Sequence, residues 1–282
     1  MKNSPKILVT GGGGQLGQEL ERELSNEHLI VLARNQLDIT DCQAVELAVK
    51  THQPDFIINA GAFTAVDGCE SEPDLAYAAN ALGPARLVQA AERYRARVVQ
   101  ISTDYVFDGT LSRPYRETDK TKPCSEYGRT KEAGERAMRP EDLIVRTSWL
   151  CGAHGKNLLK TIVSLASQGT PMKFVEDQIG HPSFTSDVAS MIHDLVLKEA
   201  NGIFHVTNQG IVSWYEFVKE ILKALGKPTD LVSAIKTEEL IPRRAALRPA
   251  NSVLDNLALR EAGIPELPDF RDSLPQVLEK IV

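Results

Sequence analysis

The stretch VTGGGGQLGQEL, Val9 to Leu20, joins a short apolar run to a segment with helical spacing. Two glycine patterns overlap in it: Gly12, Gly14 and Gly17 fit G-x-G-x-x-G, and Gly11, Gly14 and Gly17 fit G-x-x-G-x-x-G. Backbone without a Cβ can turn tightly and approach a pyrophosphate, whose charge suits the N–H groups at the start of a helix. Gly17 would let that helix pack closely. A strand before and a helix after is the context that a dinucleotide-binding loop requires, so this stretch predicts one.

Around this loop, apolar runs alternate with segments of helical periodicity. The runs predict strands at 6–10, 28–33, 55–59, 97–102 and 143–146, and the periodic segments predict helices at 15–24, 44–52, 75–94 and 126–138. Apolar runs without polar alternation are typical of a parallel sheet that is covered on both faces. We therefore predict an α/β fold with a doubly wound, parallel Rossmann-type sheet in a dinucleotide-binding domain over residues 1–150.

The pattern changes after Trp149, where glycines and prolines divide the chain into shorter segments. Residues 151–282 are predicted to form mostly a smaller C-terminal substrate-binding lobe. One apolar run near 203–206 is expected to return to the sheet as a further strand.

The bulk composition limits the class of partner. The 282 residues carry a net charge of −6 without a long stripe of Lys and Arg, which disfavours nucleic acid and anionic membranes as partners. The apolar run near the N-terminus is too short for a signal peptide, and no run is long enough to span a membrane. The four cysteines Cys42, Cys69, Cys124 and Cys151 are too far apart to indicate a zinc site or a redox pair. We expect free thiols and a cytoplasmic protein.

The end of the second predicted strand bears on the choice of cofactor. NAD-binding domains place an acidic residue there for the ribose 2′-hydroxyl, but this chain has Ala33 and Arg34. A guanidinium suits a 2′-phosphate, so NADPH is favoured over NADH, which stays as the alternative. Asp38, before Ile39, is a candidate for the adenine side or for a turn ahead of the next helix.

A second constellation follows the fourth predicted strand. STDYVFDG spans Ser102 to Gly109, and YGRTK places Tyr127 and Lys131 at i and i+4, on one helix face. The cation is expected to lower the pKa of the phenol from about 10 toward working pH. Thr103, at the carboxyl end of its strand, could hold the same substrate oxygen. Ketone reduction needs a hydride donor, a proton donor and a group that orients the oxygen, and the loop, Tyr127 and Thr103 supply one each.

Tyr-x-x-x-Lys alone is a weak pattern, because such pairs are more often surface neighbours. The combination has more weight. With GGGGQLG, LDIT, NAGAFTAVDGCESE, ISTDYVFDG, EYGRTKEAGE, VRTSWL, VEDQIGHPS and RPANSVLD in this order, the chain resembles the extended short-chain dehydrogenase/reductases and, more narrowly, the dTDP-4-dehydrorhamnose reductase family. The resemblance implies reduction of the 4-keto group of dTDP-4-dehydro-6-deoxy-L-mannose to dTDP-L-rhamnose by NADPH or NADH, with Tyr127 as the proton donor.

The resemblance also implies roles for individual residues. The catalytic set is Thr103, Tyr127 and Lys131. The cofactor set is Gly11, Gly14, Gln15, Leu16 and Gly17 at the pyrophosphate, Arg34, Asp38 and Ile39 at the adenosine, and Ala62, Phe63, Thr64, Tyr127 and Lys131 at the nicotinamide ribose. The substrate set is Val66, Thr103, Asp104 and Trp149 around the sugar, with Asn157, Gln178 and Arg248 as candidates for the nucleotide part.

Two departures from the family pattern matter. Ala33 stands where some members carry an acid, which leaves the cofactor preference to Arg34. Some members bridge a dimer through magnesium held by carboxylates, but Ser186 stands where such a carboxylate is expected. We therefore predict no metal and a monomer or weak homodimer.

Two other functions stay open. Nucleotide-sugar 4-epimerases and 4,6-dehydratases share the loop, the tyrosine and the lysine, although dehydratases usually place an acidic pair after the threonine and here Tyr105 follows Asp104. A non-catalytic role, like that of the regulatory subunit of methionine adenosyltransferase, is a further alternative. The intact Thr103, Tyr127 and Lys131 argue against it.

Overall fold

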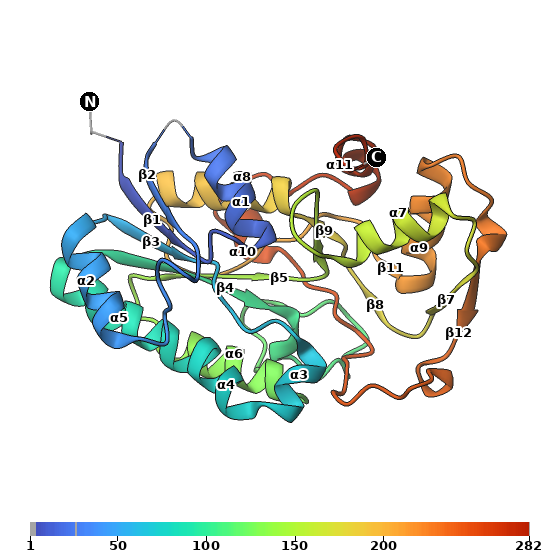
Figure 1. Ribbon diagram of the computed structural model, residues 1–282, viewed down its shortest axis with the longest axis horizontal. Helices are drawn as coiled ribbons and strands as arrows, with labels where there is room; N and C mark the ends of the chain where they lie inside the picture. The colour runs from blue at the N-terminus through green and yellow to red at the C-terminus, as the bar shows by residue number, and fades with distance from the viewer. Residues whose placement is uncertain (1–3, 26, 282) are drawn as a thin grey trace.

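A six-stranded parallel sheet forms the centre of the molecule in a computed structural model that describes residues 4–25 and 27–281. From edge to edge its strands are β10 (Gly202–His205), β5 (Leu143–Thr147), β4 (Arg97–Thr103), β3 (Phe56–Asn59), β1 (Lys6–Thr10) and β2 (His28–Leu32) (Figure 1). Every pairing in this sheet is parallel, and Val9 of β1 lies between Val31 and Ile58. The predicted strands and the doubly wound sheet are confirmed.

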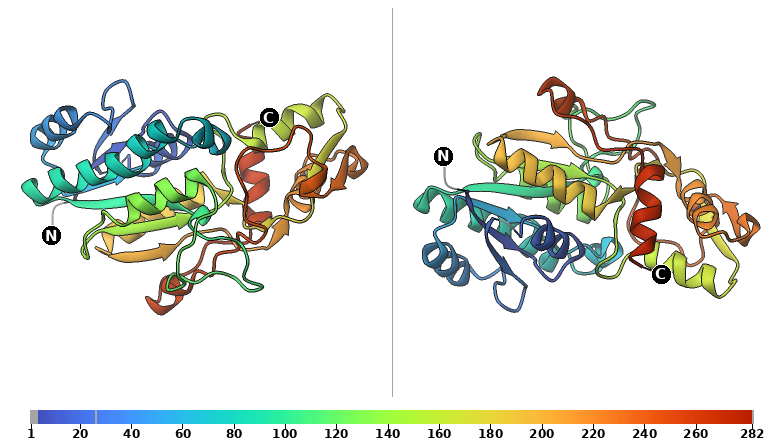
Figure 2. Two further views of the ribbon diagram at one scale, coloured as in Figure 1. Left: turned by 90° about the horizontal axis from the view of Figure 1, so that it is seen from below. Right: turned by 90° about the horizontal axis from the view of Figure 1, so that it is seen from above.

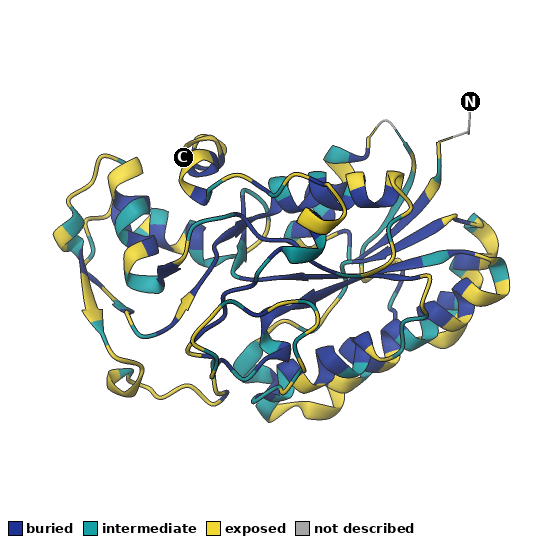
Figure 3. Ribbon diagram, turned by 180° about the vertical axis from the view of Figure 1, so that it is seen from behind, coloured by how far each residue is buried: buried dark blue, intermediate teal, exposed yellow. Residues whose placement is uncertain are grey.

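Helices cover both faces of the sheet because both faces are apolar. Helices α1 (Gln15–Glu23) and α8 (Thr185–Leu197) lie on one face; α2 (Cys42–His52), α5 (Gly83–Tyr94) and α6 (Glu126–Glu135) lie on the other (Figure 1). Successive residues of β1 alternate between these layers: Ile7 and Val9 belong to the core under α1 and α8, and Leu8 belongs to the core under α2 and α5. Figure 3 shows the resulting contrast between buried strands and exposed outer helix surfaces.

Several helix boundaries differ from the predictions, among them the end of α1, which lies at Glu23 and not at residue 24. Helix α2 begins at Cys42 because the Asp41 carboxylate accepts hydrogen bonds from Gln43 N and Ala44 N. The predicted helix 75–94 is not uniform: α4 (Pro73–Tyr77) and α5 are joined by a π-helical segment, Ala78–Leu82. Helix α6 ends at Glu135, three residues before the predicted 138.

A second body contains its own apolar core (Figure 2). Its elements are α7 (Leu158–Ser167), α9 (Trp214–Ala224), α11 (Phe270–Glu279) and the short strand pairs β7 (Met172–Val175) with β12 (Val232–Ile235), β6 (Leu150–Cys151) with β9 (Ser183–Phe184), and β8 (Ile179–Gly180) with β11 (Val212–Ser213). The chain beyond residue 150 contributes to both bodies, because α8, β10 and α10 (Leu257–Glu261) pack on the sheet.

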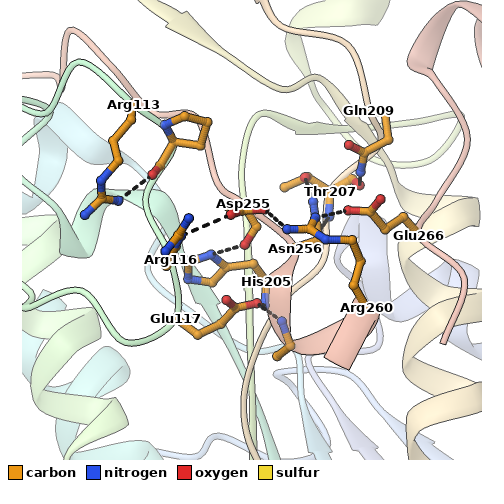
Figure 4. Close-up of polar contacts among 12 residues, drawn as sticks. Arg113, Arg116, Glu117, His205, Thr207, Gln209, Asp255, Asn256, Arg260 and Glu266 are labelled. Atoms are coloured by element: carbon orange, nitrogen blue, oxygen red, sulfur yellow. Dashed lines mark hydrogen bonds and ion pairs between the residues drawn. The ribbon is translucent and has the colours of Figure 1, made fainter. Parts of the chain in front are cut away.

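Hydrogen bonds and ion pairs connect the segment around residues 255–260 to strand β10 of the sheet (Figure 4). One oxygen of Glu117 accepts hydrogen bonds from His205 N and Ala258 N, each at 3.1 Å. The carboxylate of Asp255 pairs with Arg260 at 2.5 Å, and its carbonyl oxygen lies 3.1 Å from His205 Nδ1. Burial lowers the pKa of His205 to about 3, so its imidazole is neutral at physiological pH.

All four cysteines carry free thiols. In the part of the chain that the structure describes, none of the helices has the length and apolar character needed to span a bilayer.

Candidate active site

The glycine loop is packed so tightly that side chains would not fit at its ends. Gly11 has φ +73°, and a Cβ there would lie 2.5 Å from Gly61 N. A Cβ at Gly17 would lie 2.4 Å from Gly11 O, so Gly17 allows the helix to approach the loop. Gly14 caps α1 without a side-chain hydrogen bond, which leaves the first N–H groups of the helix available to an anion.

Two cavities meet at this loop. Gly13, Gly14, Ala60, Gly61 and Ala62 line both of them. The cofactor-type cavity, of about 610 Å³, is also lined by Gly11, Ala33, Arg34, Asp38, Ile39 and Phe63. The reaction cavity, of about 560 Å³, is also lined by Gln15, Leu16, Thr64, Val66, Thr103, Asp104, Tyr127, Lys131, Trp149 and Asn157. The structure thus brings most of the predicted site residues to one continuous region at the carboxyl ends of the strands.

Arg34 and Asp38 lie beside each other in the cofactor-type cavity. The Arg34 side chain is 81% exposed and its Nε lies 3.5 Å from Asp38 Oδ2. Asp38 Oδ1 accepts hydrogen bonds from the backbone N and the hydroxyl of Thr40, at 2.9 and 2.7 Å. These hydrogen bonds lower the pKa of Asp38, so its carboxylate is ionised, while the guanidinium has room to turn to another anion.

Thr103, Tyr127 and Lys131 come together from β4 and α6. Thr103 is the last residue of β4, and its hydroxyl donates to Asp104 Oδ1 at 2.8 Å. Tyr127 lies in the first turn of α6, which begins after the Ser125 cap. Gly128 permits this packing, since a Cβ there would lie 2.1 Å from Tyr105 O.

The expectation that Lys131 lowers the pKa of Tyr127 below its usual value is wrong. Burial raises the pKa of the Tyr127 phenol above its usual value and the charge of Asp104 raises it further, while a hydrogen bond with Thr103 lowers it only in part. The net pKa of the phenol therefore stays above its usual value despite the nearby Lys131, whose ammonium donates to the carbonyl oxygen of Ile101 at 2.6 Å. Tyr127 is therefore protonated at neutral pH, which is the state that a proton donor needs.

The pKa of Lys131 also differs from its usual value. Burial lowers its pKa to about 8, and the opposing charge of Glu135, one turn further along α6, limits the decrease. Glu135 forms a buried ion pair with Arg146 of β5 at 2.7 Å. Because its pKa is about 8, the side chain of Lys131 is charged below that pH.

Several polar atoms on the reaction cavity lack a partner among the described residues. Asp104 Oδ2, Gln15 Oε1 and Thr147 Oγ1 are buried without a hydrogen bond, and all three residues line the cavity. Burial also raises the pKa of Asp104 to about 6. Buried polar atoms are rarely left unpaired, so Gln15 and Thr147 are candidates to bind a polar ligand, whereas the Asp104 carboxylate also has Ser252 as a hydrogen-bond partner.

Three predicted substrate residues have local partners. Asn157 lines the reaction cavity but also caps α7 and donates to Gly152 O. Gln178 donates to Thr237 Oγ1 at 2.9 Å, and Arg248 makes a two-pronged contact with Asp67 at 2.9 and 2.7 Å. Neither Gln178 nor Arg248 is among the described residues that line the two cavities.

Two residues that shape the site were not predicted from the sequence. Asn80, in the π-helical segment, accepts from Phe63 N at 2.8 Å and donates to Thr130 Oγ1 of α6 at 3.1 Å. Trp214 lines the reaction cavity and stacks on Trp149. The one signal for Trp214 in the sequence is its place after Ser213 in a capping-box pattern, S-x-x-E.

Among residues 4–25 and 27–281, no group of three or more His, Cys, Asp and Glu side chains is placed to hold a metal ion.

A parallel sheet with a glycine loop at α1, and a Tyr–Lys pair on the helix after β4, defines an oxidoreductase fold of the short-chain dehydrogenase/reductase type. The model of one family, the RmlD substrate binding domain, matches residues 5–282, and the chain belongs to that family.

Relatives extend over nearly the whole chain. The dTDP-4-dehydrorhamnose reductase of Streptomyces griseus is 41% identical over 283 residues, which covers 96% of this chain and 92% of that protein. The crystal structure of a dTDP-4-dehydrorhamnose reductase from Clostridium acetobutylicum is 41% identical with a TM-score of 0.92 and covers 97% of this chain and 98% of its own. A dTDP-4-dehydrorhamnose reductase from Bacillus anthracis in complex with NADP is 35% identical with a TM-score of 0.94, covering 98% and 99%.

Proposed function

We propose that this chain reduces the 4-keto group of dTDP-4-dehydrorhamnose to give dTDP-L-rhamnose, with NADPH as the cofactor and NADH as the less favoured alternative. The names of the Streptomyces and Clostridium relatives support the reaction, and the NADP complex of the Bacillus anthracis relative supports the cofactor. The observation that carries the proposal is the meeting of Thr103, Tyr127 and Lys131 in one cavity with the glycine loop.

The residues present fit NADPH. The cradle at Gly11 and Gly17 has no room for side chains, and Gln15, which lines the reaction cavity, has a buried Oε1 without a hydrogen-bond partner. Gly14, Gln15 and Leu16 would hold the pyrophosphate, Arg34 the 2′-phosphate, Asp38 and Ile39 the adenosine, and Ala62, Phe63 and Thr64 the nicotinamide ribose. When bound, the cofactor supplies the hydride.

The chain's own residues handle the oxygen and its proton. Thr103 orients the keto oxygen by its hydroxyl, and Tyr127 donates a proton to that oxygen as negative charge develops on it. The Lys131 ammonium stabilises the phenolate that remains, which a buried site would otherwise disfavour. Val66, Asp104 and Trp149 surround the sugar.

The nucleotide end is assigned to Asn157, Gln178 and Arg248. Arg248 would have to exchange part of its contact with Asp67 for the substrate diphosphate, an anion that a guanidinium also binds in a two-pronged way. Gln178, bonded to Thr237, is the weakest of the three candidates.

We further propose residues 1–150 as the dinucleotide-binding domain and most of 151–282 as the substrate-binding lobe. The enzyme would act in the cytoplasm, without a nucleic acid, membrane or metal, as a monomer or weak homodimer. Sedimentation with and without EDTA tests the last point: a tight dimer that EDTA dissociates would contradict it.

The reaction is tested by supplying dTDP-4-keto-6-deoxyglucose together with a 3,5-epimerase and NADPH. We expect many cofactor molecules oxidised per enzyme, and a product with the mass of dTDP-L-rhamnose. Omitting the epimerase is the control. If this chain were a nucleotide-sugar 4-epimerase or 4,6-dehydratase, the assay would show no net oxidation of NADPH. A protein that only binds would likewise oxidise no NADPH and would leave the sugar unchanged.

A further inference from the structure

Trp149 has a backbone conformation that needs support from its neighbours. Its φ is +45°, in the left-handed region that large residues avoid. Trp149 comes two residues after the end of β5 and lines the reaction cavity. Gly180 makes room for it, since a Cβ at Gly180 would lie 2.7 Å from Trp149 Cε2.

Trp214 is the second residue that contacts the Trp149 ring. Its ring lies parallel to that of Trp149, with 3.6 Å between the ring centroids and 10° between the planes. Trp214 is the first residue of α9, where Ser213 and Glu216 fix the helix start by a reciprocal capping box. It also lies against Phe217 in the core of the second body.

The stack therefore connects the two bodies at the wall of the cavity. Trp149 follows a strand of the central sheet, Trp214 begins a helix of the second body, and both line the cavity that contains Thr103 and Tyr127. A ligand that contacts Trp149 contacts a surface whose position is set by Trp214.

We propose that Trp214 is a positioning residue that holds Trp149 against the apolar face of a 6-deoxy sugar, and so couples sugar binding to the placement of the second body. The proposal rests on the function proposed above. Aromatic rings suit a sugar face that lacks the 6-hydroxyl, because no polar group is then left against the indole.

The chain contains two tryptophans, so its indole signals come from this pair alone. Two stacked indoles couple their absorption and give a paired circular-dichroism band, which a single indole does not. Titration with dTDP-L-rhamnose in the absence of cofactor should change this band in a saturable way, whereas dTDP alone should leave it nearly unchanged. An equal response to dTDP alone would overturn the assignment to the sugar.

The variant Trp214→Leu should raise KM for the sugar nucleotide about tenfold, with KM for NADPH unchanged within about twofold, and Trp214→Phe should restore most of the affinity. Tyr215→Leu is the control, because Tyr215 packs on the same helix but does not line the cavity. If Trp214→Leu does not fold, the titration of the paired circular-dichroism band in the unaltered protein is the test, and an equal response to dTDP alone is then the outcome that overturns the proposal. Normal sugar KM in both variants, or equal losses for sugar and NADPH, would overturn the proposal.

The titration needs no turnover, so the two proposals can fail separately. A chain whose band saturates with the sugar nucleotide but that oxidises no NADPH would contradict the proposed reaction and support the role of Trp214.

Discussion

The Nζ atom of Lys131 lies 2.6 Å from the carbonyl oxygen of Ile101, inside the molecule and one helical turn from the phenol of Tyr127. A strand of the central sheet thereby fixes the position of the lysine. In the mechanism that we propose, the lysine stabilises the phenolate that proton donation leaves, in a site where the phenol is protonated beforehand.

The state of Lys131 should appear in the pH dependence of turnover. Its pKa of about 8 leaves the ammonium charged below that pH and neutral above it. We expect turnover to fall as pH rises through about 8, and Lys131→Met to be slow at every pH without a descending limb there. A variant that retains the limb would show that another group titrates.

Replacing Glu135 should shift the pH at which turnover falls. Its charge supports the protonated form of Lys131, so Glu135→Gln should move the descending limb to lower pH. The change also leaves Arg146 buried without its carboxylate, at a cost of about 3–5 kcal/mol in the free energy of unfolding. Denaturant unfolding and pH profiles check both effects. Glu132→Gln, on the same helix, is the control, and identical profiles for the two variants would contradict this role for Glu135.

Arg34 should set the cofactor preference. Its exposed guanidinium lies in the cofactor-type cavity, so Arg34→Ala should raise KM for NADPH about tenfold and leave KM for NADH nearly unchanged. Lys50→Ala, which removes an exposed cation elsewhere, should change neither KM. If the unaltered enzyme uses both cofactors equally well, the role given to Arg34 is wrong.

Asp67 should hold the segment that carries Arg248. The Asp67 carboxylate accepts from Arg248 and from Ala246 N, so Asp67→Asn should loosen the chain around Arg243 and Arg244. Tryptic cleavage there should accelerate by about two- to fivefold, as expected for a partly exposed ion pair. The exposed Glu238→Gln is the control. Equal cleavage rates in both variants would show that the pair does not restrain this segment.

The strands, the glycine loop and the Tyr–Lys pair are predictable because each depends on local sequence. Apolar runs such as 6–10 must be buried on both faces, and a four-residue spacing places Tyr127 and Lys131 on one side of a helix. The fold class and the candidate catalytic residues therefore follow from the order of residues along the chain.

The remainder depends on contacts between distant parts of the chain. The π-helical segment contains Asn80, whose side chain bonds to Phe63, and the guanidinium of Arg248 is taken up by Asp67, 181 residues away. The predicted direction of the Tyr127 pKa shift is wrong because sequence spacing shows a neighbouring charge but not the burial of the phenol. The two-residue strands of the second body carry no periodicity at all.

Hydride transfer to the sugar, with the proton supplied by Tyr127, is tested most directly with NADPH deuterated at the transferring position. The unaltered enzyme, given the epimerase-derived 4-keto sugar, should place the deuterium on C4 of dTDP-L-rhamnose. Tyr127→Phe should bind NADPH normally but form this product about 10²-fold more slowly or less. A product without deuterium, or a Tyr127→Phe variant that forms labelled product at the normal rate, would contradict the account.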